Sequence, residues 1–446
     1  MPYLMSAFAL AVLVSVGSSQ QPASVATTTV GPECRSPTQA TRSSDSLCVT
    51  RSAAIAGALL ANPQLQVAGA VAQQARAARV QGVALPDPIA SAEWGGSRAP
   101  FGYGAGGADS RVYGASVTIP FLNKFRLNGQ IGTAGIRQSE ADSVAVRQAL
   151  ASETSQAYDQ LLSALRRHAN LQLADSLAAD FLKKTQARFD AGTVARLDVV
   201  NAQVVVAQTQ NDFIANEREI ANARSALNRL LGRPLGAPVS TADTLAVPPD
   251  LPDLNAVESA ALHNRPELLS LEQQQRGAHA ATSLAREYWL PDLTIGISRD
   301  YLAAPTPGYI TTGLSFPIPI LYRNHAKGEI AQGRYREAEL AASYRDLQAS
   351  VSQDVRIAYA TASTALRQAR FIRDALLPAT QQAYRIAAAS YALGGLSALE
   401  VNSARAALLD AESQYTEALA AANGARADLE RAVAAPLETF VTGVIP

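Results

Sequence analysis

The chain has 446 residues, of which 17% are charged and 48% are hydrophobic, and its formal net charge is zero. This balance lacks the excess of lysine and arginine that indicates nucleic-acid binding. Four histidines and two cysteines leave few ligands for a metal site built from several such side chains. Aromatic residues make up only 6%, so the composition favours long helices with close small-residue contacts over a bulky globular core.

The first part of the chain, residues 1–19, is predicted to be a secretory signal peptide. Residues 7–17 form an apolar core that small residues and then Gln20 and Gln21 follow. No lysine or arginine precedes this core, which leaves a start further upstream and an apolar N-terminal helix as alternative interpretations. After this segment no stretch approaches the roughly 20 apolar residues that a membrane-spanning helix needs. A crossing of the bilayer by the mature chain would therefore use strands.

Residues 20–51 are predicted to be a flexible N-terminal segment, rich in serine, threonine, proline and glutamine. Both cysteines, Cys34 and Cys48, lie in it. Because an exported chain meets an oxidising compartment, a disulfide between them is one prediction. Two unpaired thiols on a flexible arm are the alternative.

Residues 52–240 are predicted to form a first unit of helix, β-hairpin (86–121), long helix, turn and returning helix. A linker at 241–253 leads to a second unit at 254–437 with the same order of elements and a hairpin at 291–320, and residues 438–446 form a C-terminal tail. Segments of the first unit recur about two hundred residues later in the second. Such a long period indicates two tandem copies of one architectural unit.

Both hairpins have a period of two, with apolar residues on one face and serine, threonine or glycine on the other. The strand ending at Ile119 and the strand beginning at Leu293 show it most clearly. Such faces suit the wall of a barrel with lipid outside and water inside, and about ten residues per strand suffice to cross a bilayer at a tilt. Ordinary hairpins on a soluble domain are the alternative. Four strands cannot close a barrel, and open edges are not tolerated in lipid, so other chains would have to complete it.

The helical run that follows each hairpin is predicted to be near 100 Å long at 1.5 Å per residue. Each run ends at a glycine turn, Gly192 in the first unit and Gly394 in the second. The two shorter helices of a unit, placed end to end, have about the same length as its one long helix. This match in length is expected for the wall of a helical cylinder. Pro378 interrupts the second long run and predicts a bend there, with a break between two helices as the alternative.

Paired motifs in the two units carry a family resemblance. "ALLANPQL" and "ALHNRPEL" open the units, "TIPF" and "SFPI" close the hairpins, and "ARFDAGTVARLDVVNAQ" and "ASYALGGLSALEVNSAR" cross the turns. In this order the motifs resemble the TolC family of outer-membrane efflux proteins over about residues 52 to 437. The resemblance implies a mainly α-helical fold with a small β part, in which four strands per chain complete a 12-stranded transmembrane β-barrel in a homotrimer. It also implies a long α-helical barrel that extends from the outer membrane into the periplasm.

The resemblance further implies where the channel narrows and where a partner docks. Glu400 takes the place of the first acidic gate residue of the family, Ser403 stands where a second is expected, and Tyr391 matches an aromatic residue near the constriction. A gating arginine of the family is replaced by Leu396, so the closing network differs here. A ring of Glu400 carboxylates would favour cations. The alternative for Glu400 is a solvated charge at the start of a helix, which is also the interpretation of Asp198. The alternative for Tyr391 is ordinary helix packing. The adaptor is expected to dock on the two turns, which comprise the residues Gly192, Thr193, Val194, Gly394, Gly395 and Leu396.

The predicted function is that of a passive exit duct in a tripartite efflux system, driven by an inner-membrane pump through a periplasmic adaptor protein. The outer-membrane component of a type I secretion system and a coiled-coil scaffold without a pore are the alternatives. No phosphate-binding loop, HExxH or Gly-x-Ser-x-Gly motif occurs in the sequence, so no catalytic, cofactor or metal residues are assigned. Solute choice is expected to lie mostly in the pump and the adaptor.

Overall fold

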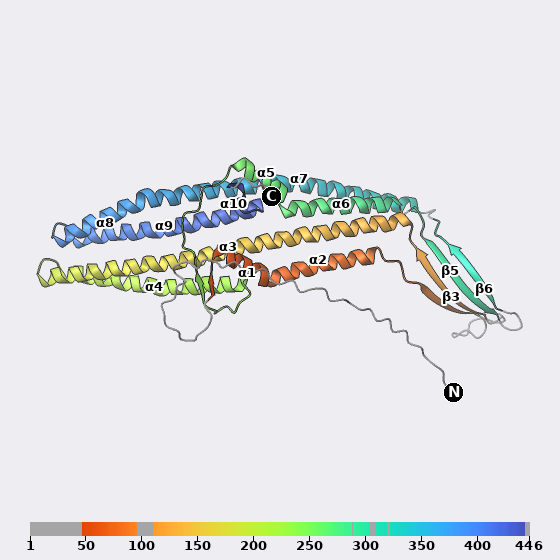
Figure 1. The fold of residues 1–446 in the computed structure, drawn as a ribbon, viewed down its shortest axis with the longest axis horizontal. Coiled ribbons are helices and arrows are strands. Elements are labelled where there is room, and N and C mark those ends of the chain that lie inside the picture. Colours follow the sequence, from red (N-terminus) through yellow and green to blue (C-terminus); the bar gives the residue numbers. More distant parts are fainter. Residues whose placement is uncertain (1–46, 96–109, 288, 303–307, 319–321, 442–446) are drawn as a thin grey trace, which may run out of the picture.

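A computed structural model describes residues 47–95, 110–287, 289–302, 308–318 and 322–441. The predicted signal peptide (1–19) and Cys34 lie outside these residues, so the Cys34–Cys48 disulfide stays a prediction. The described chain is elongated, with a β-sheet at one end, helices along its length and two helical turns at the other end (Figure 1).

The first unit and the segment that follows it contain helices that run beside one long helix. In chain order the elements are β1 (Leu47–Val49), α1 (Arg51–Ala61), α2 (Pro63–Gly82), β2 (Ile89–Gly95), β3 (Ser110–Ile119), α3 (Leu122–Asp190), α4 (Arg196–Leu230) and β4 (Val239–Thr241). Helix α3 has 69 residues, which is about 100 Å at the α-helical rise. Helices α1, α2 and α4 pack along it.

The second predicted unit also has two short helices, two strands and long helices, in that order. It contains α5 (Leu254–Asn264), α6 (Pro266–Glu287), β5 (Leu293–Leu302), β6 (Tyr309–Ser315), α7 (Tyr322–Phe371), the π-helical segment η2 (Ile372–Leu376), α8 (Leu377–Ala392), α9 (Ala398–Val433) and α10 (Glu438–Val441). Helix α3 of the first unit packs against α6 and α9 of the second, so these three helices join the two units. The expected mainly helical fold with a small β part is confirmed.

The short helices break where a proline follows a polar residue. Asn62 ends α1 and caps α2, because its side chain accepts a hydrogen bond from Gln64 N and Pro63 then opens α2. The second unit breaks at the equivalent place, between Arg265 and Pro266. Proline suits the first turn of a helix because its missing N–H needs no partner there.

Three predicted boundaries differ from the structure. Residues 47–49, predicted to be flexible, form β1, which pairs in parallel with β4 (Leu47 opposite Val239). Thr241, the first residue of the predicted linker, ends β4, and the predicted tail begins with the short helix α10. Val49 and Val239 are buried in the main hydrophobic cluster, so burial orders a segment whose composition predicts flexibility.

The chain stays helical through Pro378. The segment η2, which ends two residues before Pro378, forms a wider π-helical turn in which Leu377 N donates to Ile372 O. Pro378 lacks the N–H that would bond four residues back, and a π turn is one way in which a helix accommodates such a local interruption. The run from α7 to α8 is therefore continuous, and the alternative of two separate helices is wrong.

The sheet is antiparallel, with the strand order β2-β3-β5-β6. Its central pair joins the two units, with Ala115 opposite Ile297 and Val117 opposite Ile295. Strands β2 and β6 lie at the edges of the sheet, so among the described residues each has one side without a pairing strand. Both predicted hairpins form.

Candidate functional site

The two helical turns lie together at the end of the molecule opposite the sheet (Figure 1). Gly192 has φ +72° and Gly394 has φ +82°, a conformation in which a side chain is strained. In the first turn Thr193 N donates to Arg188 O (2.9 Å), and in the second Gly395 N donates to Ser390 O (2.9 Å). These bonds from beyond the glycine back to the last helical turn satisfy carbonyls that the helix end leaves free. The six predicted docking residues therefore lie on two turns of the same geometry.

Exposed leucines surround the two turns. Leu393 is 90% exposed, Leu399 is 78% exposed and Leu197 is 66% exposed. An exposed leucine by itself is ordinary, but apolar side chains gathered at one tip of a long molecule indicate an interaction surface. These leucines were not predicted from the sequence. Leu197 and Leu399 occupy equivalent positions directly after the two turns, which is the signal that identifies them.

Glu400 lies in the first turn of α9, where it forms a reciprocal cap with Ser397. Ser397 N and Ser397 Oγ each donate to Glu400 Oε2 (2.8 Å), and Glu400 N donates to Ser397 Oγ (3.3 Å). The hydrogen bond from the Ser397 backbone, and then that from its hydroxyl, lower the pKa of the Glu400 carboxyl below its ordinary value. The carboxylate is therefore ionised at neutral pH and remains exposed, as does Ser403. Asp198 caps α4 in a similar way by accepting from Ala195 N (3.3 Å).

Tyr391 is buried between helices and does not line a surface of the chain. Its side chain is 1% exposed, and its hydroxyl lies 3.0 Å from Thr185 Oγ1. The Arg188 guanidinium lies over its ring at 4.4 Å and donates to its backbone oxygen at 3.0 Å. A side chain enclosed in this way cannot narrow a pore directly, so the structure supports packing for Tyr391. It joins α3 to α8 just above the turns.

The two faces of the sheet differ in chemistry. One face is mainly apolar: Ala90, Ala92, Trp94, Arg111, Tyr113, Ala115, Val117, Ile119, Leu293, Ile295, Ile297, Arg299, Tyr301, Ile310, Thr312 and Leu314. The other face, apart from Ile89, Val112 and Tyr309, is small or polar: Ser91, Glu93, Gly114, Ser116, Thr118, Thr294, Gly296, Ser298, Asp300, Thr311, Gly313 and Ser315. Edge-to-face contacts join Trp94 to Tyr113 (6.4 Å) and Tyr113 to Tyr301 (6.2 Å). Apolar residues flanked by aromatic residues are typical of a lipid-facing β-surface.

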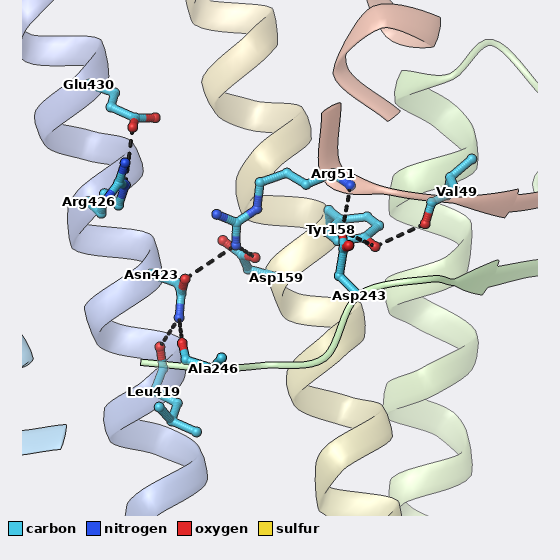
Figure 2. A network of polar contacts seen from close by, with 10 residues as sticks. All are labelled: Val49, Arg51, Tyr158, Asp159, Asp243, Ala246, Leu419, Asn423, Arg426 and Glu430. Atoms are coloured by element: carbon cyan, nitrogen blue, oxygen red, sulfur yellow. Dashed lines mark hydrogen bonds and ion pairs between the residues drawn. The ribbon is translucent and has the colours of Figure 1, made fainter. Parts of the chain in front are cut away.

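A partly buried polar network crosses the middle of the shaft (Figure 2). The Arg51 guanidinium forms an ion pair with Asp159 on α3 and lies 3.4 Å from Asn423 Oδ1 on α9. Arg51 N donates to Asp243 Oδ2 (2.8 Å), and the Tyr158 hydroxyl lies 2.9 Å from the same oxygen. Four segments that are distant in sequence therefore meet at one place.

Burial dominates the electrostatics of this network. It raises the pKa of Asp159, and the positive charge of Arg51 opposes that rise. Burial also raises the pKa of the Tyr158 hydroxyl, and its hydrogen bond with Asp243 adds to the effect. None of these residues could be identified from the sequence, because a single charged side chain on a helix has no local pattern that indicates burial.

In the part of the chain that the structure describes, no three histidine, cysteine, aspartate or glutamate side chains are grouped so that they could hold a metal ion. Within the same ranges no single helix has the length and hydropathy of a membrane span. The bent pair α1 and α2 passes that test only when the two are taken together.

Comparison with known proteins places the chain among outer-membrane channels. The family model for outer membrane efflux protein matches residues 54–233 and 257–435. CzcC, the cobalt-zinc-cadmium resistance protein of Cupriavidus metallidurans, is 22% identical over 281 residues, which are 62% of this chain and 66% of CzcC. The pyoverdine export outer membrane protein OpmQ of Pseudomonas putida is 26% identical over 311 residues, or 67% of this chain and 65% of OpmQ. The chain thus spans slightly less than two thirds of the length of these relatives.

A solved structure has the same fold. The Campylobacter jejuni CmeC outer membrane channel superposes with a TM-score of 0.72 and 19% identity, covering 91% of this chain and 94% of that chain. The family match extends over most of both units, and the shaft and sheet agree with the fold of a solved channel. The chain belongs to the outer membrane efflux protein family and is an outer-membrane protein.

Proposed function

We propose that this chain is the outer-membrane channel of a tripartite efflux system. It is a passive exit duct for small molecules or ions, which an inner-membrane pump drives through a periplasmic adaptor. The observation that carries this proposal is the sheet with one apolar and one small, polar face at the end of a shaft about 100 Å long. Lipid on the first face and water on the second would let solutes leave the shaft across the outer membrane.

Three copies of the chain would complete the pore. Strands β2 and β6 are the edges of the sheet, and lipid offers no partner for their free backbone groups. Pairing β6 of one chain with β2 of the next removes both edges, and three chains give about twelve strands, an even number within the range of known barrels. The two units, as tandem repeats, would likewise contribute equivalent helices to an α-helical barrel.

The test of this proposal is fractionation followed by electrical recording. The full chain should collect in the outer-membrane fraction as a heat-modifiable trimer, and the purified trimer should conduct ions across a planar bilayer. A water-soluble monomer without conductance would contradict the proposal and favour the scaffold without a pore.

The two turns and their exposed leucines form the proposed adaptor surface. Replacing Gly394 by valine should reduce efflux severalfold in cells while trimers remain intact, because φ +82° strains a β-branched residue by about 1–2 kcal/mol and shifts the turn. Gly69→Val is the matched control, since Gly69 is exposed, has an ordinary φ and has no neighbour within 4 Å of a new Cβ. Normal efflux by Gly394→Val, measured as drug or metal tolerance alongside trimer content, would refute docking at this turn.

Glu400 is proposed to line the narrow end of the duct. The lowered pKa of the Glu400 carboxyl keeps it ionised at neutral pH. Three such carboxylates would attract cations. Glu400→Gln should lower the cation-to-anion permeability ratio in single-channel recordings, whereas Asp198→Asn, the equivalent change in the first unit, should leave it nearly unchanged. Equal ratios in wild type and Glu400→Gln would leave Glu400 as a helix cap only.

The names of the two relatives refer to different solutes, a set of metal ions for CzcC and pyoverdine for OpmQ. We therefore propose a duct that discriminates by charge at its tip rather than by the chemical identity of the solute. The proposal assigns no catalytic residue.

A further inference from the structure

A cavity of about 890 Å³ lies between α2, α3 and α6 close to the sheet. Arg79, near the end of α2, lines it shortly before the chain enters β2, and Arg126 lines it one turn after the chain enters α3 from β3. Arg137 lies about three helical turns further along α3. The cavity therefore begins just below the sheet and extends away from it along the shaft.

The cavity has an excess of positive charge. Its ionisable lining residues are Arg79, Arg126, Arg137, Glu272, Arg276 and His279. Arg276 is paired with Glu272 (2.5 Å), and His279 lies 3.6 Å from Glu337. These two basic groups therefore have acidic neighbours.

The other three arginines have no carboxylate within ion-pair distance among the described residues. Arg79 Nε donates to Thr133 Oγ1 (3.2 Å) and Arg126 Nε to Asn123 Oδ1 (2.8 Å). All three side chains are exposed. Partly apolar surroundings, with Val83 and Phe125 in the lining, strengthen their attraction for an anion.

An exposed apolar residue, Leu122, lies next to these arginines, between them and the sheet. Leu122 is 82% exposed and precedes Arg126 by four positions, which places both on one face of α3. An exposed leucine followed by arginines along one helix face is the arrangement expected at the boundary of a bilayer, with the leucine at the acyl chains and the guanidinium groups at the phosphates.

One buried hydrogen-bond acceptor in the lining of the cavity has no partner among the described residues. Gln273 is 8% exposed and lines the cavity, and its Oε1 has no hydrogen-bond partner within the described residues. A buried polar atom without a partner is costly, and a hydroxyl group of a ligand would satisfy it. A glycerol headgroup offers such a hydroxyl next to a phosphate.

We propose that this cavity binds an anionic phospholipid of the phosphatidylglycerol class from the periplasmic leaflet of the outer membrane. The guanidinium group nearest the headgroup binds the phosphate, the other arginines of the cavity add longer-range attraction, and Gln273 Oε1 accepts from the glycerol. This inference rests on the proposed function, because it requires the sheet to cross the membrane directly above the cavity.

The test measures lipid binding to the purified full chain by native mass spectrometry, with phosphatidylglycerol and phosphatidylcholine titrated in turn. Wild type should prefer phosphatidylglycerol. The double variant Arg126→Gln/Arg137→Gln should weaken that binding about 25-fold, because each basic residue near a lipid surface contributes about fivefold. Raising the salt concentration should reduce the preference of wild type, because the arginines are exposed.

The control is Arg218→Gln/Arg224→Gln, which removes two exposed arginines from α4. Unchanged phosphatidylglycerol binding by the Arg126/Arg137 variant, or an equal loss in the control, would overturn the proposal. Inorganic phosphate titrated in the same assay distinguishes the sources. Displacement of the lipid by millimolar phosphate would identify a site for a soluble anion and would also overturn it.

A third variant, Gln273→Leu, tests the hydroxyl contact. It should reduce the preference for phosphatidylglycerol over phosphatidic acid, which has no glycerol headgroup, and an unchanged preference would contradict that contact. Conductance of the same samples separates the two proposals. A conducting channel without lipid preference refutes only the lipid site, whereas a sample that does not conduct refutes the duct.

Discussion

Arginine in place of Ile297 is expected to prevent most of the chain from assembling in the outer membrane. Ile297 lies in the middle of β5, on the apolar face of the sheet, and is 54% exposed within the chain. If this face meets lipid, arginine near the bilayer midplane costs about 2–4 kcal/mol per chain. The cost recurs in each copy of a trimer, so the combined effect exceeds what one substitution in a soluble protein usually has. The measurement is the fraction of heat-modifiable, folded protein in outer-membrane extracts.

The neighbouring residue provides the control. Ser298 lies on the opposite face and pairs with Gly114 on β3 and Thr311 on β6, so Ser298→Arg would project into water and should assemble at close to the wild-type level. The two variants add the same charge one residue apart, and only the face differs. Equal losses in both, or none in either, would show that the two faces do not separate lipid from water.

Replacing Arg51 by methionine is expected to lower the stability of the shaft by up to about 3 kcal/mol per chain at neutral pH, the lower end for a buried pair, because the Arg51 side chain is 32% exposed. Asp159 is 4% exposed, and without Arg51 its buried charge has no ion-pair partner in the part of the chain that the structure describes. The contacts of Arg51 with Asp243 and Asn423 also join segments of both units, although its backbone bond to Asp243 survives the substitution. Thermal unfolding of the purified channel measures the loss.

The loss of stability caused by Arg51→Met should be larger at neutral pH than at acidic pH. Burial raises the pKa of Asp159 in the folded chain, so its contribution to stability is fully present below the unfolded value of about 3.9 and is lost as the pH rises through the folded value. Removing Arg51 removes the charge that limits this rise. The difference between wild type and Arg51→Met should therefore be largest at neutral pH and should shrink on acidification towards pH 4.

Arg76→Met is the matched control, because Arg76 forms an ion pair with Glu140 in which both side chains are about half exposed. Such a pair contributes about 0–1 kcal/mol. If the two variants unfold at the same temperature, or if the difference does not shrink with acid, the central network does not stabilise the shaft in the way its geometry suggests.

Local periodicity was enough to predict the elements of this fold. A period of two in the hairpins predicted strands that are observed at Ser110–Ile119 and Leu293–Leu302, and the helical runs end at Gly192 and Gly394 as expected. These features depend on residues close together in sequence, such as a glycine that relieves a left-handed turn. The capping roles of Asp198 and Glu400 were predictable for the same reason.

Prediction was weaker wherever a distant segment decides the environment. Tyr391 matched an expected constriction residue, but Phe181, Thr185 and Arg188 of α3 enclose it. The strand β1 forms only because β4, which follows it by about 190 residues in sequence, supplies its partner. Neither outcome has a local signal.

By itself, the sequence determined the order of helices and strands, the two chemically different faces of the sheet and the glycine turns, since each follows from propensities and periods within a few turns of chain. Only the tertiary structure decided that Arg51, Asp159, Asp243 and Asn423 meet in one partly buried network, and that unpaired arginines gather beside an exposed leucine under the sheet. The physical reason is that burial and pairing depend on which helices pack together. Two units folded side by side create environments that no single stretch of chain contains.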